Sequence, residues 1–354
     1  MNSILETAKS YLETEVAPMA NVIDSDPEAL RRALAGLCCR NLMALRRPME
    51  YGGPALSESE FRAFQEMVAR YSGSLAFLQT QHQSAVSMLS KSDNEILKEH
   101  ILPECADGSR LIGIGFSQLR RHGPPILRAE RIDGGYRLDG HAPWVTGYGF
   151  YGEFLVGAAL EDGRSVFGLV PFVPVDGIKF GNVMRLAAME SPQTVSADFE
   201  GYFIADSHVA FLKPPNWIHD NDLINITVQG FFAIGCAMAG LDVVERANDK
   251  RRTDWIEGAH RALMAEVESC RQAMVAAQDS SNEDMTTDEK LRVRAWAIDL
   301  AVRCAHAGVA CSGGAANSVD HDAQRVYREA LVYTVSAQTS PIMRATLERL
   351  TSTR

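Results

Sequence analysis

The segment from Leu111 to Ala158 alternates apolar and polar residues with a period of two, and glycines separate its runs. This alternation is typical of strands that bury one face of a sheet. The segments before and after it carry apolar residues at helical spacing and almost no strand pattern. The chain is therefore limited to folds in which two helical regions pack against a central β domain, an α+β class.

Residues 1–106 predict an all-helical N-terminal domain. Asp26 before Pro27 is typical of an N-cap followed by a first helical turn. Ser57 with Glu60 three residues later is a capping-box pattern that predicts another helix start. The helices are expected at 3–22, 26–39, 57–71, 74–89 and 91–101.

Residues 107–213 predict the middle β domain, and residues 214–354 predict a C-terminal four-helix bundle. After the opening stretch, strands are expected in SVFGLVPF, GIKFG, TVSADFEGYFI and HVAFL. The bundle helices are expected at 221–248, 254–278, 290–311 and 320–350.

Composition excludes several classes of partner. A net charge of −10 over 354 residues gives no attraction for nucleic acid or anionic lipid. No apolar run approaches the ~18 residues that span a membrane, so no membrane partner is expected. The seven cysteines are scattered without a C-x-x-C pair, which predicts reduced packing residues and no metal centre. The acidic, amphipathic N-terminus is unlike a secretory signal, so a cytoplasmic location is expected.

Five short motifs occur in one order along the chain. They are EVAPMA with Asp24, PMEYGGPALSESEF, IGFSQL, GYRLDGHAPWVTG and the run SGGAANSVDHDAQRVYREALVYTVSAQTSPIMRA. Together they resemble the acyl-CoA dehydrogenase superfamily over nearly the whole chain. The resemblance implies an N-terminal helical domain, a middle β-barrel or sheet domain and a C-terminal four-helix bundle. It also implies a homodimer or homotetramer.

The resemblance implies a flavin, FAD or alternatively FMN, whose ring lies against the middle sheet. Phe116 and Ser117 match the strand residues that meet the ring's pyrimidine edge, and Trp144, Val145 and Thr146 match the strand that lies beside the ring. A tryptophan two residues before a threonine on one strand places both on the same face. The alternative is that Trp144 is a core aromatic and Thr146 a surface hydroxyl.

At the nucleotide end, the family's diphosphate-binding turn matches Gly123, which two prolines follow here, and proline removes backbone donors. Arg120, Arg121 and His122 stand just before it and either replace those donors or are simply solvated. The resemblance assigns Gly313 and Gly314 to cofactor binding, as a close backbone approach near the partner subunit's cofactor; the alternative is that the pair ends a helix.

The family's catalytic base is a glutamate at one of two positions, and here Ala337 and Asn225 occupy them. Asp222, one helical turn before Asn225, is the remaining candidate; the alternative is an acid that complements a helix N-terminus. His82 is a candidate for the substrate pocket, with a core histidine as the alternative.

These residues predict a flavin-dependent oxidoreductase of the acyl-CoA dehydrogenase type that lacks the usual glutamate and acts on an acyl thioester or a related small substrate. One alternative is a flavin-dependent monooxygenase of the same fold, for which an apolar slot and fixed donors suffice. Another is a non-catalytic binding or scaffold relative that has lost the base.

Overall fold

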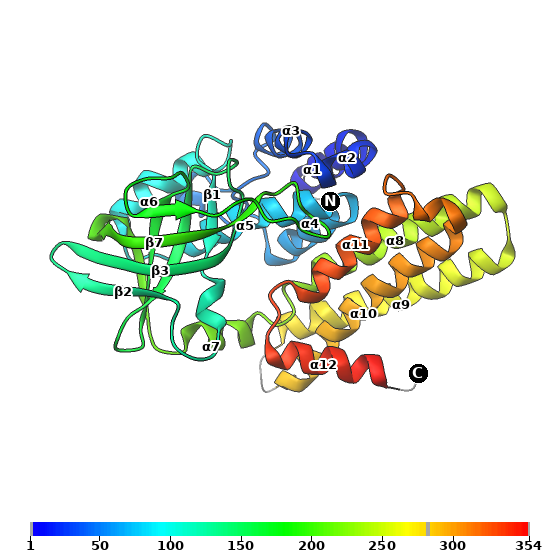
Figure 1. Cartoon of the computed structure of the whole chain (residues 1–354). Helices are drawn as coiled ribbons and strands as arrows, with labels where there is room; N and C mark the ends of the chain where they lie inside the picture. Colours follow the sequence, from blue (N-terminus) through cyan, green and yellow to red (C-terminus); the bar gives the residue numbers. More distant parts are fainter. Residues whose placement is uncertain (1–2, 281–283, 353–354) are drawn as a thin grey trace.

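The computed structural model describes residues 3–280 and 284–352. Figure 1 shows the sheet on one side, the C-terminal helices on the other, and the N-terminal helices over the contact between them. Helices give way to strands between Cys105 and Ile112, and helices return between Lys213 and Trp217. This is the predicted order of helical, β and helical regions.

The N-terminal helices begin at the predicted caps. The Asp26 side chain accepts a hydrogen bond from the Glu28 amide, and Ser57 and Glu60 form both halves of a capping box. The predicted first helix is not continuous. A π-helical segment (Leu12–Val16) and a 3₁₀ segment that contains Pro18 (Ala17–Met19) divide it. The helices are α1 (Ser3–Tyr11), α2 (Ala20–Ser25), α3 (Pro27–Cys38), α4 (Glu58–Tyr71), α5 (Gly73–Leu89) and α6 (Glu95–Ile101).

The middle domain is an eight-stranded sheet in the order β6-β7-β3-β2-β4-β5-β8, with β1 pairing parallel to β4. Neighbouring pairs are mostly antiparallel, and a bulge interrupts the β3–β7 register between Ala142 and Val145. The strands are β1 (Ile112–Gly115), β2 (Leu127–Ile132), β3 (Gly135–Thr146), β4 (Glu153–Ala159), β5 (Ser165–Pro171), β6 (Ile178–Phe180), β7 (Thr194–Ala205) and β8 (Val209–Lys213).

Two predicted C-terminal helices are each broken, and both breaks border the site described below. The expected helix 221–248 is interrupted at 225–229, and the expected helix 320–350 is interrupted at 336–339, where Ala337 has a positive φ of 48°. The helices are α7 (Trp217–Ile224), α8 (Gly230–Arg251), α9 (Asp254–Asp279), α10 (Thr287–Ser312), α11 (Asp322–Val335) and α12 (Ser340–Thr351). Part of the polar break expected at 279–289 lies outside the described residues.

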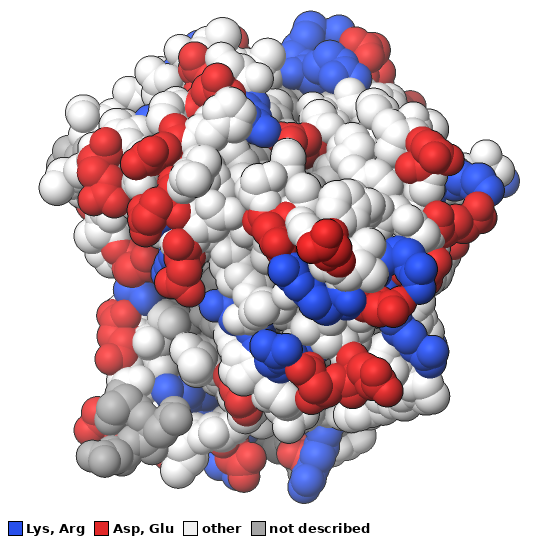
Figure 2. All heavy atoms as spheres, turned by 90° about the vertical axis from the view of Figure 1, so that its left-hand side faces the viewer, with Lys and Arg blue, Asp and Glu red and all other residues white. Residues whose placement is uncertain are grey.

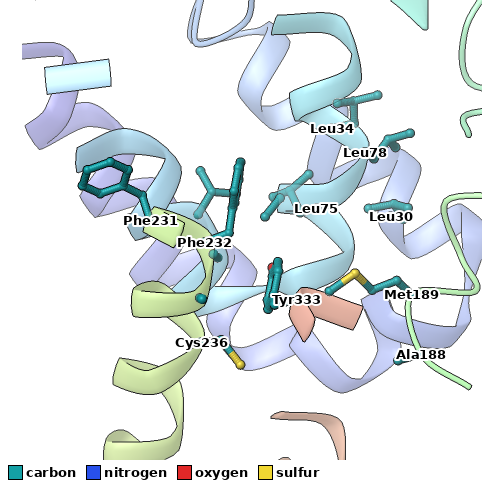
Figure 3. Close-up of a cluster of buried hydrophobic side chains, with 14 of the residues drawn as sticks. Leu30, Leu34, Leu75, Leu78, Ala188, Met189, Phe231, Phe232, Cys236 and Tyr333 are labelled. Carbon is teal, nitrogen blue, oxygen red and sulfur yellow. The ribbon is translucent and has the colours of Figure 1, made fainter. Parts of the chain in front are cut away.

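Helix α8 forms the centre of the helical packing because its small residues allow close approach. A Cβ at Gly235 would lie 2.2 Å from the Glu66 carbonyl oxygen of α4, and one at Gly240 would lie 2.5 Å from the Cys304 backbone of α10. Figure 3 shows α8 beside the N-terminal helices, with Phe232 near Leu75 and Tyr333. The N-terminal helices and the bundle therefore share one apolar core.

Asp24 joins all three domains through one buried carboxylate. It is 4% exposed and accepts hydrogen bonds from the Ser74 hydroxyl of α5 (3.0 Å), the Met189 amide of the sheet domain (3.2 Å) and the Arg328 guanidinium of α11 (2.7 Å). A carboxylate with donors from three segments fixes their relative positions.

Other predicted features concern the surface and the cysteines. Figure 2 shows Lys and Arg interspersed with Asp and Glu over the face on the sheet side. All seven cysteines are free, and five of them are buried. Within 3–280 and 284–352, no helix is long and apolar enough to cross a bilayer, and no cluster of His, Cys, Asp or Glu is arranged to hold a metal ion.

Candidate functional site

A cavity of about 940 Å³ lies where the sheet, α5 and the bundle meet. One wall comes from the ends of β1 and β3, a second from α5, and a third from the two helix breaks at 225–229 and 336–339. Cavities of ~300–1,000 Å³ are typical of small-molecule and cofactor sites. We call the first wall the sheet wall and the third the bundle wall.

Trp144 and Thr146 lie together on the sheet wall, at the end of β3. The strand's bulge falls at Pro143, which has no amide to donate to the ladder. Trp144 is 53% exposed, whereas Thr146 is 6% exposed and its hydroxyl lies 3.0 Å from that of Thr194. The alternative of a core tryptophan with a surface threonine is therefore wrong on both counts.

Phe116 and Ser117 complete the sheet wall just after β1. The Phe116 ring packs edge-on against Phe167, with 5.5 Å between centroids. The Ser117 hydroxyl is buried and has no hydrogen-bond partner among the described residues. A buried hydroxyl without a partner beside a cavity is a donor available to a ligand.

Val145 does not line the cavity. Its side chain is fully buried on the opposite face of β3, where it approaches Gly115. Side chains alternate along a strand, so Trp144 and Thr146 on the cavity face require Val145 in the core. The prediction that Val145 belongs to the site is wrong for its side chain.

Helix α5 faces the cavity, but His82 does not. The cavity-lining residues of α5 recur at helical spacing and include Thr80, Gln81 and Ser84. The His82 ring is fully buried on another face, accepts from the Ile112 amide at Nδ1 (3.0 Å), and lies 2.8 Å from the Cys105 carbonyl oxygen at Nε2. Burial lowers the pKa of His82 to about 4. His82 is a core histidine, and its prediction as a pocket residue is wrong.

Both residues at the family's base positions lie on the bundle wall. Asn225 follows the last residue of α7 and donates to the Asn221 carbonyl (2.8 Å). Ala337 stands in the turn between α11 and α12. Their two helix breaks line the same cavity, so the structure brings the two positions to one site although 112 residues separate them, from 225 to 337.

Asp222 is the only acidic residue among the described residues that line the cavity. Both of its oxygens are bound by Arg120, with Nε and Nη2 each 2.8 Å away. A bidentate guanidinium pair of this kind occupies both carboxylate oxygens, so neither is free to accept a proton from a ligand. Asp222 lies in the second half of α7, so the alternative of an acid at a helix N-terminus is also wrong.

Cationic side chains surround the cavity. Arg120 and Arg46 line it and are paired, Arg120 with Asp222 and Arg46 with Glu58. Four further cationic side chains of the lining have no carboxylate partner among the described residues. These four are Lys91, Arg121, Lys213 and Arg294. In a chain of net charge −10, such a lining favours an anionic ligand.

Other predicted nucleotide contacts lie outside the cavity lining. His122 is exposed and stacks on His219 at 6.2 Å between centroids. Gly123 sits in an open turn with φ of 97°. Gly313 and Gly314 follow the end of α10, where Gly313 has a positive φ of 62° and acts as the helix terminator.

Most of the lining residues carry no sequence signal for the site, and three of them bear on its chemistry. Thr194 on β7 partners Thr146, Lys213 at the end of β8 lies over the rings of Phe211 and Trp217, and Arg294 on α10 reaches the bundle wall. Thr194 and Lys213 lie at the ends of strands, where side chains that line a site at the sheet edge are expected. A buried arginine inside a regular helical pattern carries no such signal.

The three-domain fold is that of solved acyl-CoA dehydrogenases. Butyryl-CoA dehydrogenase from Megasphaera elsdenii superposes with a TM-score of 0.80 at 17% identity, over 99% of this chain and 97% of its own. Glutaryl-CoA dehydrogenase from Mycobacterium smegmatis gives a TM-score of 0.82 at 15% identity, over 98% and 93%. At these identities the likeness shows the fold.

The sequence comparisons agree. Residues 2–109 match the family model described as acyl-CoA dehydrogenase, N-terminal domain. The mitochondrial isovaleryl-CoA dehydrogenase of Pongo abelii is 23% identical over 97% of this chain and 86% of its own length. Benzylmalonyl-CoA dehydrogenase of Aromatoleum aromaticum is 28% identical over 58% of this chain and 56% of its own. The resemblance to acyl-CoA dehydrogenases that the ordered motifs predict is confirmed, for the N-terminal domain by the family model and over 97% of the chain by relatives of low identity.

Proposed function

We propose that this chain is a flavin-dependent oxidoreductase of the acyl-CoA dehydrogenase type, which holds FAD, or alternatively FMN, in the cavity and acts on an acyl thioester or a related small substrate. One observation carries the proposal: Trp144, Thr146 and the unpartnered Ser117 hydroxyl line the same cavity. Enzymes of this superfamily and the curated dehydrogenases that resemble this chain support it.

The residues present fit a flavin ring. The half-exposed face of Trp144 offers a flat apolar surface for stacking. Ser117 offers a hydroxyl to the ring's polar edge, and the hydroxyl pair of Thr146 and Thr194 fixes a second polar group nearby. When bound, a flavin supplies an acceptor for hydride or single electrons. The protein's part is to hold and orient the ring and to keep water from it.

The phosphates of the nucleotide have a different anchor from the family's turn at Gly123. Arg121, Lys91 and Lys213 line the cavity without carboxylate partners and can bind phosphate through charge-assisted hydrogen bonds. Arg120 is held by Asp222 and is not free for this role.

The reaction is not proton abstraction by a glutamate at either family position, because Asn225 and Ala337 have no carboxylate. Asp222 is bound at both oxygens by Arg120. This favours chemistry that needs no carboxylate base and gives a second candidate function, a flavin-dependent monooxygenase. There, reduced flavin and oxygen supply the reactivity, and the cavity supplies an apolar slot with fixed donors.

The working unit is a homodimer or homotetramer. Apolar side chains of α12 that do not line the cavity stand exposed, including Met343 (46%), Leu347 (56%) and Leu350 (61%). An exposed apolar face of this kind favours association with another copy.

The test begins with the visible absorbance spectrum of the purified protein and the identity of any flavin released on denaturation. A protein without flavin that also fails to bind added FAD or FMN contradicts the enzyme and leaves the binding or scaffold relative. Anaerobic bleaching of the flavin by an acyl-CoA supports the dehydrogenase. No bleaching, together with a hydroxylated product formed from reduced flavin and oxygen, supports the monooxygenase.

A further inference from the structure

Arg294 is a cation at the bundle wall that has no ion-pair partner among the described residues. It is 1% exposed and among the largest fully buried side chains of the described residues. Its Nη2 donates to the Ser336 carbonyl (3.3 Å), the residue next to Ala337. Its Nε and Nη1 have no hydrogen-bond partner in the described part of the chain. Most of the guanidinium's hydrogen-bonding capacity is therefore unused.

Such an arrangement is unfavourable in the empty protein. Burial lowers the pKa of Arg294 to about 9, so the side chain is still charged at neutral pH. A buried charge without a counter-ion is strongly destabilising, and no carboxylate of the described residues pairs with this one. The one acid of the cavity lining, Asp222, is taken by Arg120.

The surroundings indicate what completes the pair. Ile226 and Ile342 line the cavity with Arg294 and belong to one apolar cluster with Leu291 and Ala295 of its helix, so this end has apolar walls. A single cation at an apolar end suits an apolar chain that finishes in one anionic group. A carboxylate matches the fork of a guanidinium in a bidentate pair.

We propose that Arg294 is the specificity-determining residue for a substrate whose acyl chain ends in a carboxylate. The ligand's carboxylate pairs with Nε and Nη1, beside Ser336 and Ala337 on the bundle wall. This rests on the proposed function in taking the ligand to be an acyl thioester; the anion site itself rests on Arg294.

The experiment uses the full-length protein with its bound flavin and two thioesters of equal chain length. Glutaryl-CoA ends in a carboxylate, and valeryl-CoA has a methyl group there. Titration calorimetry is expected to give glutaryl-CoA about tenfold or more tighter binding, the range of a hydrogen bond to a charged group. Free glutarate is titrated separately, with and without flavin.

Variants assign the preference to Arg294. Arg294→Met is expected to abolish it and, because an unpaired buried charge is removed, to melt no lower than the unliganded wild type. Arg294→Lys keeps the charge and should retain part of the preference. Arg292→Met, an exposed change on the same helix, should leave it intact.

The outcomes distinguish a failure of the carboxylate-site proposal from a failure of the proposed acyl thioester function. Equal affinity for the two thioesters, or a preference that persists in Arg294→Met, overturns the proposal while the proposed function stands. If neither thioester binds but glutarate binds only when Arg294 is present, the acyl thioester function fails and the carboxylate site stands. Glutarate binding that is unchanged in both Arg294 variants overturns the site itself.

Discussion

The sheet wall and the bundle wall of the cavity differ in what they retain of the family's pattern. The sheet wall presents Trp144, Thr146 and Ser117 at the expected strand ends. The bundle wall has Ala337 and Asn225 at the base positions and an unpaired Arg294 beside them. Binding of a flat cofactor and the chemistry done beside it thus depend on separate segments, so one wall can change while the other is kept.

The largest expected effect is on the sheet wall. Trp144→Ala combined with Thr146→Ala removes the stacking surface and one hydroxyl, and flavin affinity should fall about a hundredfold, or ~3 kcal/mol. Flavin fluorescence titration measures it. Trp255→Ala, which removes an exposed tryptophan of α9 away from the cavity, is the control. Unchanged flavin affinity in the double variant would mean that the sheet wall does not hold the ring.

The second prediction concerns His82, on the face of α5 that points away from the cavity. The pKa of His82 is about 4 in the folded protein, below the usual 6.5 of a solvated histidine, because burial disfavours the charged form. The unfolded chain therefore binds a proton that the folded chain excludes. The contribution of His82 to stability should be complete above about pH 7.5 and should fall by about 2 kcal/mol between pH 7.5 and 5.

Urea unfolding at several pH values measures this loss, and the same series on His82→Gln should show a shallower dependence. Gln keeps a donor and an acceptor for the two backbone partners of His82. The same pH slope in both proteins would show that another group causes it.

The third prediction tests whether the bundle wall has a base. Asp222→Asn weakens the bidentate pair with Arg120 and should destabilise the protein by about 1–2 kcal/mol, while the pH profile of turnover keeps its shape. Asp220→Asn changes an exposed neighbour and serves as the control. A large loss of turnover with no loss of stability would instead identify Asp222 as the base.

The smallest prediction is at the turn that carries Ala337. Its φ of 48° is left-handed, a conformation that glycine adopts without steric penalty. Ala337→Gly should therefore stabilise the fold by about 0.5–1 kcal/mol in thermal unfolding, reduced by the greater freedom of glycine in the unfolded chain. A clear destabilisation would mean that the alanine methyl group packs against the bundle wall.

The contrast between the two walls also explains which parts of the structure can be predicted from the sequence. Strand alternation and the caps at Asp26 and Ser57 are local signals, and they predict the sheet and the N-terminal helices. The assignment of the sheet-wall residues to a cofactor comes from the resemblance. The helix breaks at 225–229 and 336–339 contain neither glycine nor proline, so helical periodicity was extended across them. A local sign was present in the second case, since Thr339 caps α12 and Pro341 stands in its first turn.

Two site features had no local sign at all. The pairing of Asp222 with Arg120 joins α7 to the segment after β1, and the isolation of Arg294 depends on every segment packed around it. Both follow from tertiary packing. The prediction for His82 is wrong because tertiary packing decides which face of α5 lines the cavity. That helix does line the cavity, but with residues other than His82.

Asp24 has a consequence for how the molecule comes apart. Its carboxylate holds donors from α5, from the sheet domain and from α11, so detaching any one segment leaves a buried anion short of a partner. The three domains should therefore lose their structure in one cooperative step. Amide hydrogen exchange should report similar opening free energies for the central helices of all three.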